Sequence, residues 1–263
     1  MSKAMVSCAL LGLALCASSA EYFVLPQAPG AADTNPGTQA APFRSLGKGC
    51  EVAAPGDTVW LGEGIYRETL LPKQSGEPGK PIRFAAMAGQ KVTLSGADLL
   101  AGAWQKHQGS IYSLQTDFRF IQLFVDGRMM LEARWPNSPL DDLMAMRRAE
   151  AGAGTDYDVL ADPNLPAGNW NGAVVILWPG SEWVNTTRRV TEYQAGRSFR
   201  FDRDCRSKNP DPYHAEDPYK PRAGNPYVLV GSLAGLDSPG EWFLDAVTGT
   251  VYLWTPDGDS PAG

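Results

Sequence analysis

The chain has 263 residues, which is enough for one large domain or two smaller ones with a sizeable core. Its net charge of −6 and the lack of a Lys and Arg cluster in the sequence argue against a nucleic-acid partner. Glycine and proline are both enriched without a collagen-like period, which predicts an all-β protein with many turns.

The first 20 residues have the pattern of a secretory signal peptide. Lys3 precedes an apolar stretch at residues 4–17 that is too short to span a bilayer, and the small residues Ser18, Ser19 and Ala20 follow it. We expect cleavage after Ala20, secretion to the periplasm or the exterior, and no membrane attachment afterwards. An uncleaved anchor, or a lipoprotein signal through Cys16, is the alternative.

Cleavage would leave two cysteines in an oxidising compartment. Cys50 and Cys205 could then form one disulfide, or each could be a buried thiol. The sequence does not decide between these two states.

The segment from Phe43 to residue 98 predicts one short helix followed by brief strands. Phe43, Leu46 and Cys50 are about one helical turn apart, so we expect a helix within residues 43–53. The expected strands, each bounded by turn-forming residues, lie at 58–61, 66–71, 82–87 and 92–96. In the first strand Val59 and Leu61 should share one face, with Trp60 on the opposite face beneath the helix.

No helix-length segment separates these strands, which leaves two architectures. One is an antiparallel sandwich of hairpins, and the other is a solenoid in which each strand pairs in parallel with the next coil. The long proline-bearing turn at 73–81 fits a solenoid corner better than a tight reversal, so the pattern favours the solenoid.

The second part of the chain predicts longer strands with antiparallel pairing. Alternating apolar runs occur at 119–137, 172–180 and 241–256, and tight turns are expected at 125–128 and 247–250. Residues 145–168 and 206–226 are rich in turn-forming residues, and we expect both to be long surface loops.

Residues 33–98, "DTNPGTQAAPFRSLGKGCEVAAPGDTVWLGEGIYRETLLPKQSGEPGKPIRFAAMAGQKVTLSGAD", resemble the N-terminal segment of secreted right-handed parallel β-helix proteins of the pectate-lyase-like superfamily. The flanks "QLFVDGRMMLEARWPN" and "LDSPGEWFLDAVTGTVYLWTPDG" resemble those of a β-rich insertion in some polysaccharide-active members. The resemblance implies an N-terminal cap and first coils at 21–98, an inserted antiparallel β subdomain at 99–255, and a return toward further coils at 256–263. It therefore implies that the chain is a fragment.

The same resemblance implies a secreted, carbohydrate-active protein whose partner is a polysaccharide or glycan. We expect a monomer that binds no nucleic acid. The full-length protein would act by β-elimination or glycoside hydrolysis, with calcium as a cofactor in some members. Catalytic residues in the superfamily lie on middle coils, so no catalytic residue can be transferred and this chain alone should be inactive. The alternative is a non-catalytic extracellular glycan-binding or structural module.

Four residues are candidates for substrate binding. Trp178 and Trp183 flank a Pro-Gly-Ser turn and could stack on sugar rings, although tryptophans in strands more often fill a core. Glu132 and Arg134 should lie on the same side of a strand, where they form either a substrate-facing pair or a structural salt bridge.

Weaker candidates fall between residues 202 and 217. Carboxylates in this segment could bind calcium and could raise the pKa of a nearby histidine, but the pattern favours a solvated strand and loop. The residues concerned are Asp202, Asp204, Asp211, His214, Glu216 and Asp217. His107 has no evident partner in the sequence, and we assign it no role.

Overall fold

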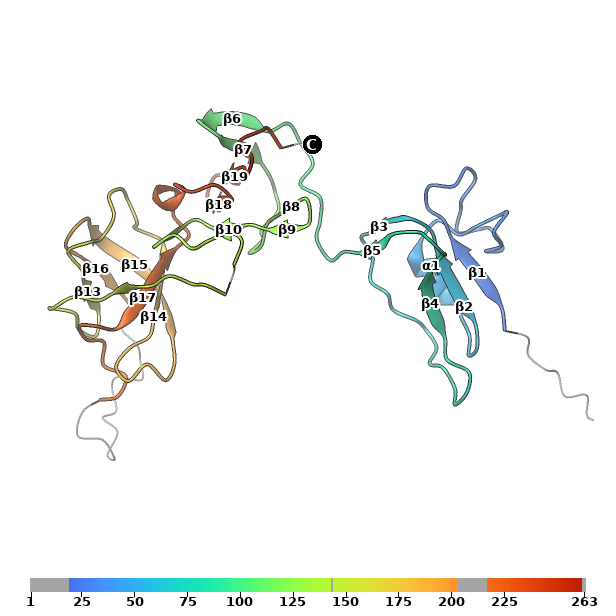
Figure 1. Ribbon diagram of the computed structural model, residues 1–263, viewed down its shortest axis with the longest axis horizontal. Coiled ribbons are helices and arrows are strands. Elements are labelled where there is room, and N and C mark those ends of the chain that lie inside the picture. The colour runs from blue at the N-terminus through green and yellow to red at the C-terminus, as the bar shows by residue number, and fades with distance from the viewer. Residues whose placement is uncertain (1–18, 143, 203–216, 262–263) are drawn as a thin grey trace, which may run out of the picture. The chain divides into compact units, whose positions relative to one another are not determined.

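The computed structural model describes residues 19–142, 144–202 and 217–261. It confirms an all-β protein, with one short α-helix and one 3-10 helix among these residues. The chain divides into two compact units, unit 1 up to Leu99 and unit 2 from Leu100 onward (Figure 1). Within the described ranges, no helix has the length and apolar character needed to cross a membrane.

Unit 1 consists of two small parallel sheets. The three-stranded sheet has the order β1-β2-β4, and the two-stranded sheet pairs β3 with β5. From β2 onward the strands alternate between the two sheets without an intervening α-helix, and their parallel pairing is the one expected of a solenoid rather than of a sandwich of hairpins. The strands are β1 (Glu21–Val24), β2 (Thr58–Leu61), β3 (Gly64–Tyr66), β4 (Arg83–Ala86) and β5 (Val92–Leu94).

The predicted helix is α1 (Leu46–Val52), and two side chains satisfy its first N–H groups. Ser45 is the N-cap residue, and its Oγ accepts from Lys48 N at 3.1 Å. The carboxylate of Glu68 accepts from Leu46 N at 3.1 Å and from Gly47 N at 2.9 Å. A carboxylate at a helix N-terminus also interacts favourably with the helix dipole, so Glu68 joins α1 to the segment after β3.

The helix packs on the face of β2 that carries Val59, not on the face that carries Trp60. A Cβ added to Gly49 would lie 2.9 Å from Val59 Cγ1, which shows how closely the two elements approach. Trp60 is half-buried, and its Nε1 donates to Glu21 Oε1 at 3.1 Å. The prediction that Trp60 lies beneath the helix was therefore wrong, because the apolar side of the strand is the one that the helix covers.

Burial of register partners in unit 1 decreases from β2 to β4 and from β3 to β5. Tyr66 on β3 is 3% exposed, whereas its register partner Leu94 on β5 is 46% exposed. Likewise Val59 on β2 is fully buried, and its partner Phe84 on β4 is only partly buried. The core is thus closed at the β1 and α1 end and thinly covered at the β4 and β5 end.

The Pro-Gly-Asp turn before β2 is held by Asp57, which is 6% exposed. Its Oδ1 accepts from Ala20 N at 2.7 Å and its Oδ2 accepts from Ala54 N at 2.9 Å. Gly56 has a φ of +96°, a value that residues with a Cβ rarely adopt. One side chain therefore joins the start of the first strand to the turn that leads into the second.

Unit 2 contains two larger sheets that are mostly antiparallel. The five-stranded sheet has the order β10-β18-β19-β7-β6, in which only β10 and β18 are parallel. Its strands are β6 (Gln105–Gln108), β7 (Ile111–Gln115), β10 (Leu131–Glu132), β18 (Glu241–Asp245) and β19 (Thr250–Trp254).

The seven-stranded sheet has the order β11-β17-β14-β15-β16-β13, with β12 also pairing with β17. Its strands are β11 (Arg134–Trp135), β12 (Ala149–Glu150), β13 (Val159–Ala161), β14 (Val174–Leu177), β15 (Thr186–Gln194), β16 (Ser198–Phe201) and β17 (Pro226–Val230). A 3-10 helix, η2 (Leu233–Gly235), follows the last of them.

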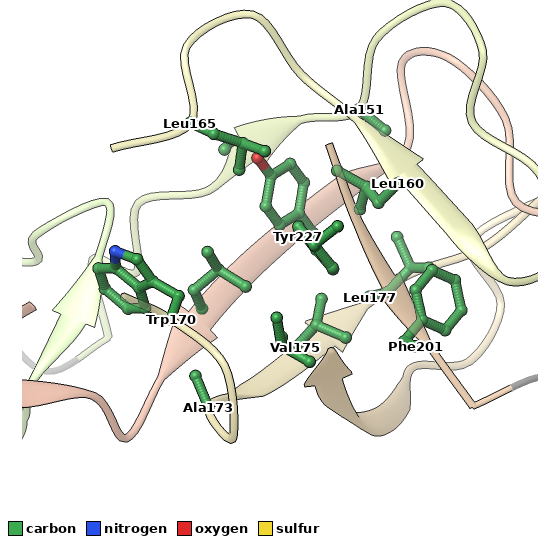
Figure 2. Packing of buried hydrophobic residues seen from close by; sticks show 13 residues of the cluster. Ala151, Leu160, Leu165, Trp170, Ala173, Val175, Leu177, Phe201 and Tyr227 are labelled. Carbon is green, nitrogen blue, oxygen red and sulfur yellow. The ribbon is translucent and has the colours of Figure 1, made fainter. Parts of the chain in front are cut away.

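The core of this sheet is built on large buried side chains, including Trp170, Tyr227 and Leu160 (Figure 2). Trp170 and Tyr227 are at most 1% exposed. Tyr227 Oη donates to Asp162 Oδ2 at 2.7 Å, so the hydroxyl is satisfied inside the core. Burial together with this carboxylate raises the pKa of Tyr227 well above its usual value.

Both predicted tight turns are present. Asp126 and Gly127 have φ values of 49° and 76° and join β8 (Phe124–Val125) to β9 (Arg128–Met129), which pair in an antiparallel hairpin. The turn before β19 joins it to β18, and Gly249 has a φ of +71°. These are the left-handed conformations that Asn, Asp and Gly adopt most readily.

Two predictions about secondary structure were wrong. The strand expected at 66–71 is β3, which runs instead from Gly64 to Tyr66. The loop expected at 145–168 contains β12 and β13, and Leu160 within it is fully buried. Leu160 lies on β13, which pairs with β16. This pairing could not be predicted from the turn-forming residues around it.

Candidate functional site

Trp178 and Trp183 lie just after β14, at the end of the seven-stranded sheet in unit 2. Trp178 is half-buried, and the guanidinium carbon of Arg148 lies 4.2 Å from its ring centroid, so this cation covers one face of the indole. Trp183 is 63% exposed. Of the two, only Trp183 presents a large apolar surface to solvent.

One aromatic ring contacts Trp183, and other aromatic and charged side chains lie beyond that ring. Its ring meets Tyr219 edge to face, with centroids 6.5 Å apart and an interplanar angle of 86°. Tyr219 lines a narrow pocket together with Tyr157, whose Oη donates to Asp217 Oδ2 at 3.0 Å. Lys220 Nζ lies 5.3 Å from the Tyr157 ring centroid. Apolar ring surface is thus placed next to hydrogen-bonding groups, the combination that binds amphipathic ligands.

Glu132 and Arg134 lie where the chain passes from one sheet to the other. Glu132 ends β10 in the five-stranded sheet, and Arg134 begins β11 in the seven-stranded sheet. Arg134 Nε donates to the backbone carbonyl of Glu132 at 3.1 Å. The Arg134 side chain therefore contacts the backbone of the segment that joins the two sheets.

A third charged residue, Glu241, belongs to the same cluster and was not a candidate from the sequence. It begins β18, pairs in register with Leu131, and is 1% exposed. Its Oε2 accepts from Asp237 N and Ser238 N at 3.2 Å each, and its buried Oε1 has no hydrogen-bond partner. Burial raises the pKa of Glu241 to about 8, even though these hydrogen bonds and the Arg134 charge lower it.

Burial also shifts the other two members of this cluster. It raises the pKa of Glu132 and lowers that of Arg134, in each case against the opposite charge of its neighbours. A strongly shifted carboxylate is often a catalytic acid. Glu241 is only 1% exposed, however, so its carboxylate is not placed to reach a polysaccharide.

The weaker candidates are scattered. Asp202 is exposed, Asp217 accepts from Tyr157 and Tyr219, and His107 meets the Tyr252 ring edge at a centroid distance of 4.9 Å. Outside the described residues lie Asp204, Cys205, Asp211, His214 and Glu216. No group of three or more acidic, His or Cys side chains able to hold a metal occurs in the part of the chain that the structure covers.

Cys50 is a free thiol in the core of unit 1, next to α1. Burial raises the pKa of this thiol, which makes it a poor nucleophile at neutral pH. Of the two states that the sequence left open for Cys50, the structure has the buried thiol.

Comparison with known proteins gives one strong likeness of fold. A solved structure titled "Glycoside hydrolase" superposes with a TM-score of 0.66 and 21% identity, over 92% of this chain and 44% of that one. A GH136 lacto-N-biosidase from Eubacterium ramulus matches 27% of this chain and 12% of its own, with 26% identity and a TM-score of 0.24, which is too low to support an argument.

The sequence comparisons are shorter. The "Uncharacterized protein YwoF" of Bacillus subtilis strain 168 is 47% identical over 68 residues, which are 26% of this chain and 14% of that protein. No protein-family model matches the chain. The chain therefore shares its fold with a protein titled as a glycoside hydrolase, and it spans less than half the length of each protein compared.

Proposed function

We propose that this chain is the N-terminal part of a secreted carbohydrate-active protein. In this proposal unit 1 begins a right-handed parallel β-helix, and unit 2 contributes a surface that binds a glycan. The observation that carries the proposal is the fold likeness to the structure titled "Glycoside hydrolase", which extends over 92% of the chain. The identity of 21% supports the fold, and the activity is our inference.

The parallel pairing in unit 1 supports the β-helix part of the proposal. Parallel strands need long crossovers, which are usually helices, but the connections from β2 to β4 and from β3 to β5 each pass through a strand of the other sheet. The increase in exposure from Tyr66 to Leu94 is what the first coils of a solenoid would show when a further coil is needed to cover the last one.

Turnover of the polysaccharide, by glycoside hydrolysis or β-elimination, is assigned to the longer protein. Hydrolysis needs two carboxyl groups that both reach the sugar. Within unit 2, Glu132 and Glu241 are carboxylates with raised pKa values, but Glu241 is only 1% exposed. We therefore expect this chain to bind glycan without cleaving it.

Affinity electrophoresis of the chain in gels that contain single polysaccharides tests the binding, and Trp183→Ala tests the surface. We expect retardation by at least one polysaccharide and a clear loss of retardation in the variant. Leu71→Ala is the matched control, because Leu71 is 71% exposed in unit 1. For turnover, the chain and the longer protein are assayed for reducing ends and for unsaturated products.

The expected result is activity in the longer protein alone. Activity of this chain would contradict the division of roles. A protein that neither binds nor cleaves any member of a broad polysaccharide panel would contradict the proposed function.

A further inference from the structure

A pocket of about 620 Å³ lies entirely within unit 2, at one end of the five-stranded sheet. One wall is the segment 115–119 that leaves β7, and the other is the turn at 247–249 between β18 and β19. Leu100 and Ala101 complete the lining. This volume is within the range of small-molecule sites, about 300–1,000 Å³.

Hydrogen bonds hold the two walls together. Thr116 N donates to Gly249 O at 2.8 Å, and Arg119 Nη2 donates to Ala246 O at 2.9 Å. A Cβ on Gly249 would lie 2.9 Å from Thr116 O, so the close approach depends on a glycine at this position. The walls are therefore fixed before any ligand arrives, which lowers the entropic cost of binding.

The turn itself is held by one carboxylate. Asp245 Oδ1 accepts from Val247 N at 2.8 Å and from Thr248 N at 3.3 Å. These hydrogen bonds, with the nearby charge of Arg119, lower the pKa of Asp245 against a smaller effect of burial. Asp245 thus remains charged next to the pocket at neutral pH.

The lining combines an aromatic face with polar groups. Phe118 is 47% exposed, and Asp117 and Arg119 flank it in the sequence. Thr116 and Thr248 also line the pocket. A pyranose ring needs this combination, because its C–H face is apolar while its hydroxyl rim needs donors and acceptors.

The charges of the pocket distinguish between neutral and acidic sugars. Asp117 in the lining and Asp245 behind the turn are negative, whereas Arg119 is the single cation of the lining and already donates to Ala246 O. A uronate carboxylate would meet more negative than positive charge here, and like charges repel.

We propose that this pocket is a binding site for one neutral sugar unit of a glycan, with Phe118 under the ring and Asp117 accepting from its hydroxyls. The inference rests on the proposed function and deepens it, since it selects neutral over uronate-containing glycans. The site is separate from the surface around Trp183 in sequence and in sheet, because that surface belongs to the seven-stranded sheet.

The test is calorimetric titration of the chain with two sets of oligosaccharides. One set is neutral, made of xylo-, manno- and cello-oligosaccharides, and the other is made of galacturonate and mannuronate oligomers. We expect a neutral oligosaccharide to bind, Phe118→Ala to weaken its affinity about tenfold, and Asp117→Asn to weaken it several-fold. Asp117→Asn preserves the side-chain shape, so it remains informative if Phe118→Ala impairs folding.

Phe124→Ala is the matched control, since Phe124 is 43% exposed on β8 outside the pocket lining, and its affinity should be unchanged. Neutral binding that neither Phe118→Ala nor Asp117→Asn weakens would overturn the pocket and leave the proposed function intact. Tighter binding of uronates would overturn the charge argument and with it the proposed specificity. Failure of every oligosaccharide and polysaccharide to bind would overturn the proposed function as well.

Discussion

In unit 1, the register partner on the later strand is the more exposed one from β3 to β5, where exposure increases from 3% at Tyr66 to 46% at Leu94. In unit 2, by contrast, paired residues on neighbouring strands are buried together. Val175 and Leu229 are register partners on β14 and β17, and both are fully buried. Unit 1 has a core that is closed at one end, whereas the core around β14 and β17 is covered on both sides.

This difference teaches where stability comes from in each unit. A parallel ladder that ends in a half-exposed strand gains little from its last strand, because apolar burial supplies most of the favourable free energy. A sheet with buried partners on neighbouring strands can carry its own cooperative core. The predictions below test this contrast in order of expected effect.

The largest effect is expected for Trp170→Ala in unit 2. Trp170 is 1% exposed and packs against Gly235, where an added Cβ would lie 2.5 Å from the indole. Its removal should lower the free energy of unfolding by about 3–5 kcal/mol, measured by denaturant titration. Hydrogen exchange should increase in unit 2 and remain unchanged at α1 in unit 1.

Trp183→Ala is the control for this experiment and should change stability by no more than about 0.5 kcal/mol, since the side chain is 63% exposed. An equal increase in exchange in both units after Trp170→Ala would show that they unfold as one cooperative body, contrary to the contrast drawn above.

A pair of leucines tests the gradient within unit 1. Leu61 on β2 is 4% exposed, and Leu94 on β5 is 46% exposed. Leu61→Ala should cost about 2–4 kcal/mol of unfolding free energy, and Leu94→Ala less than about 1 kcal/mol. The measurement is the midpoint of urea unfolding, with hydrogen exchange at α1 as the probe of unit 1. Equal costs would mean that the β5 end is as well covered as the β2 end.

A separate effect concerns pH and Glu241 at the junction in unit 2. Its pKa in the folded protein is about 8, above the ordinary value of 4.5, so the folded state holds the proton more tightly. The stabilisation from this group is complete below pH 4.5 and is lost as the pH rises to about 8. Two charged neighbours affect the pKa of Glu241: Asp237 raises it and Arg134 lowers it. Arg134 is in turn affected by the charge of Glu132.

Glu241→Gln should therefore flatten the fall in stability between pH 5 and pH 8 relative to the unsubstituted chain, as measured by unfolding midpoints across that range. Glu150→Gln, at an exposed carboxylate on β12, should leave the slope unchanged. An unaltered slope in Glu241→Gln would contradict a proton held by burial.

Local features of the fold could be predicted from the sequence. The helix at Leu46–Val52 follows from apolar spacing and Ser45, and the hairpin at Asp126 and Gly127 follows from residues that adopt positive φ. The parallel arrangement of unit 1 is favoured over hairpins by the long proline-bearing turn at 73–81, which fits a solenoid corner better than a tight reversal.

Non-local pairings could not be predicted. The longest strand, β15, was missed because only Thr186 and Val190 among its nine residues are buried, so it lacks an alternating apolar pattern. Glu241 pairs with Leu131 across a long stretch of sequence, and its burial depends on that contact. Trp183 could be named as a candidate because a tryptophan beside a turn is a local signal, whereas the pocket at Phe118 arises from two segments far apart in the chain.

The carboxylate of Asp57 also bears on how the secreted protein would be processed. Cleavage after Ala20, as the sequence predicts, removes one of the two backbone donors to this buried group. Cleavage one residue earlier would instead convert the Ala20 nitrogen, 2.7 Å from Asp57 Oδ1, into a charged α-ammonium group. A mature chain that began at Ala20 would keep this contact to Asp57, whereas one that began at Glu21 would lose it.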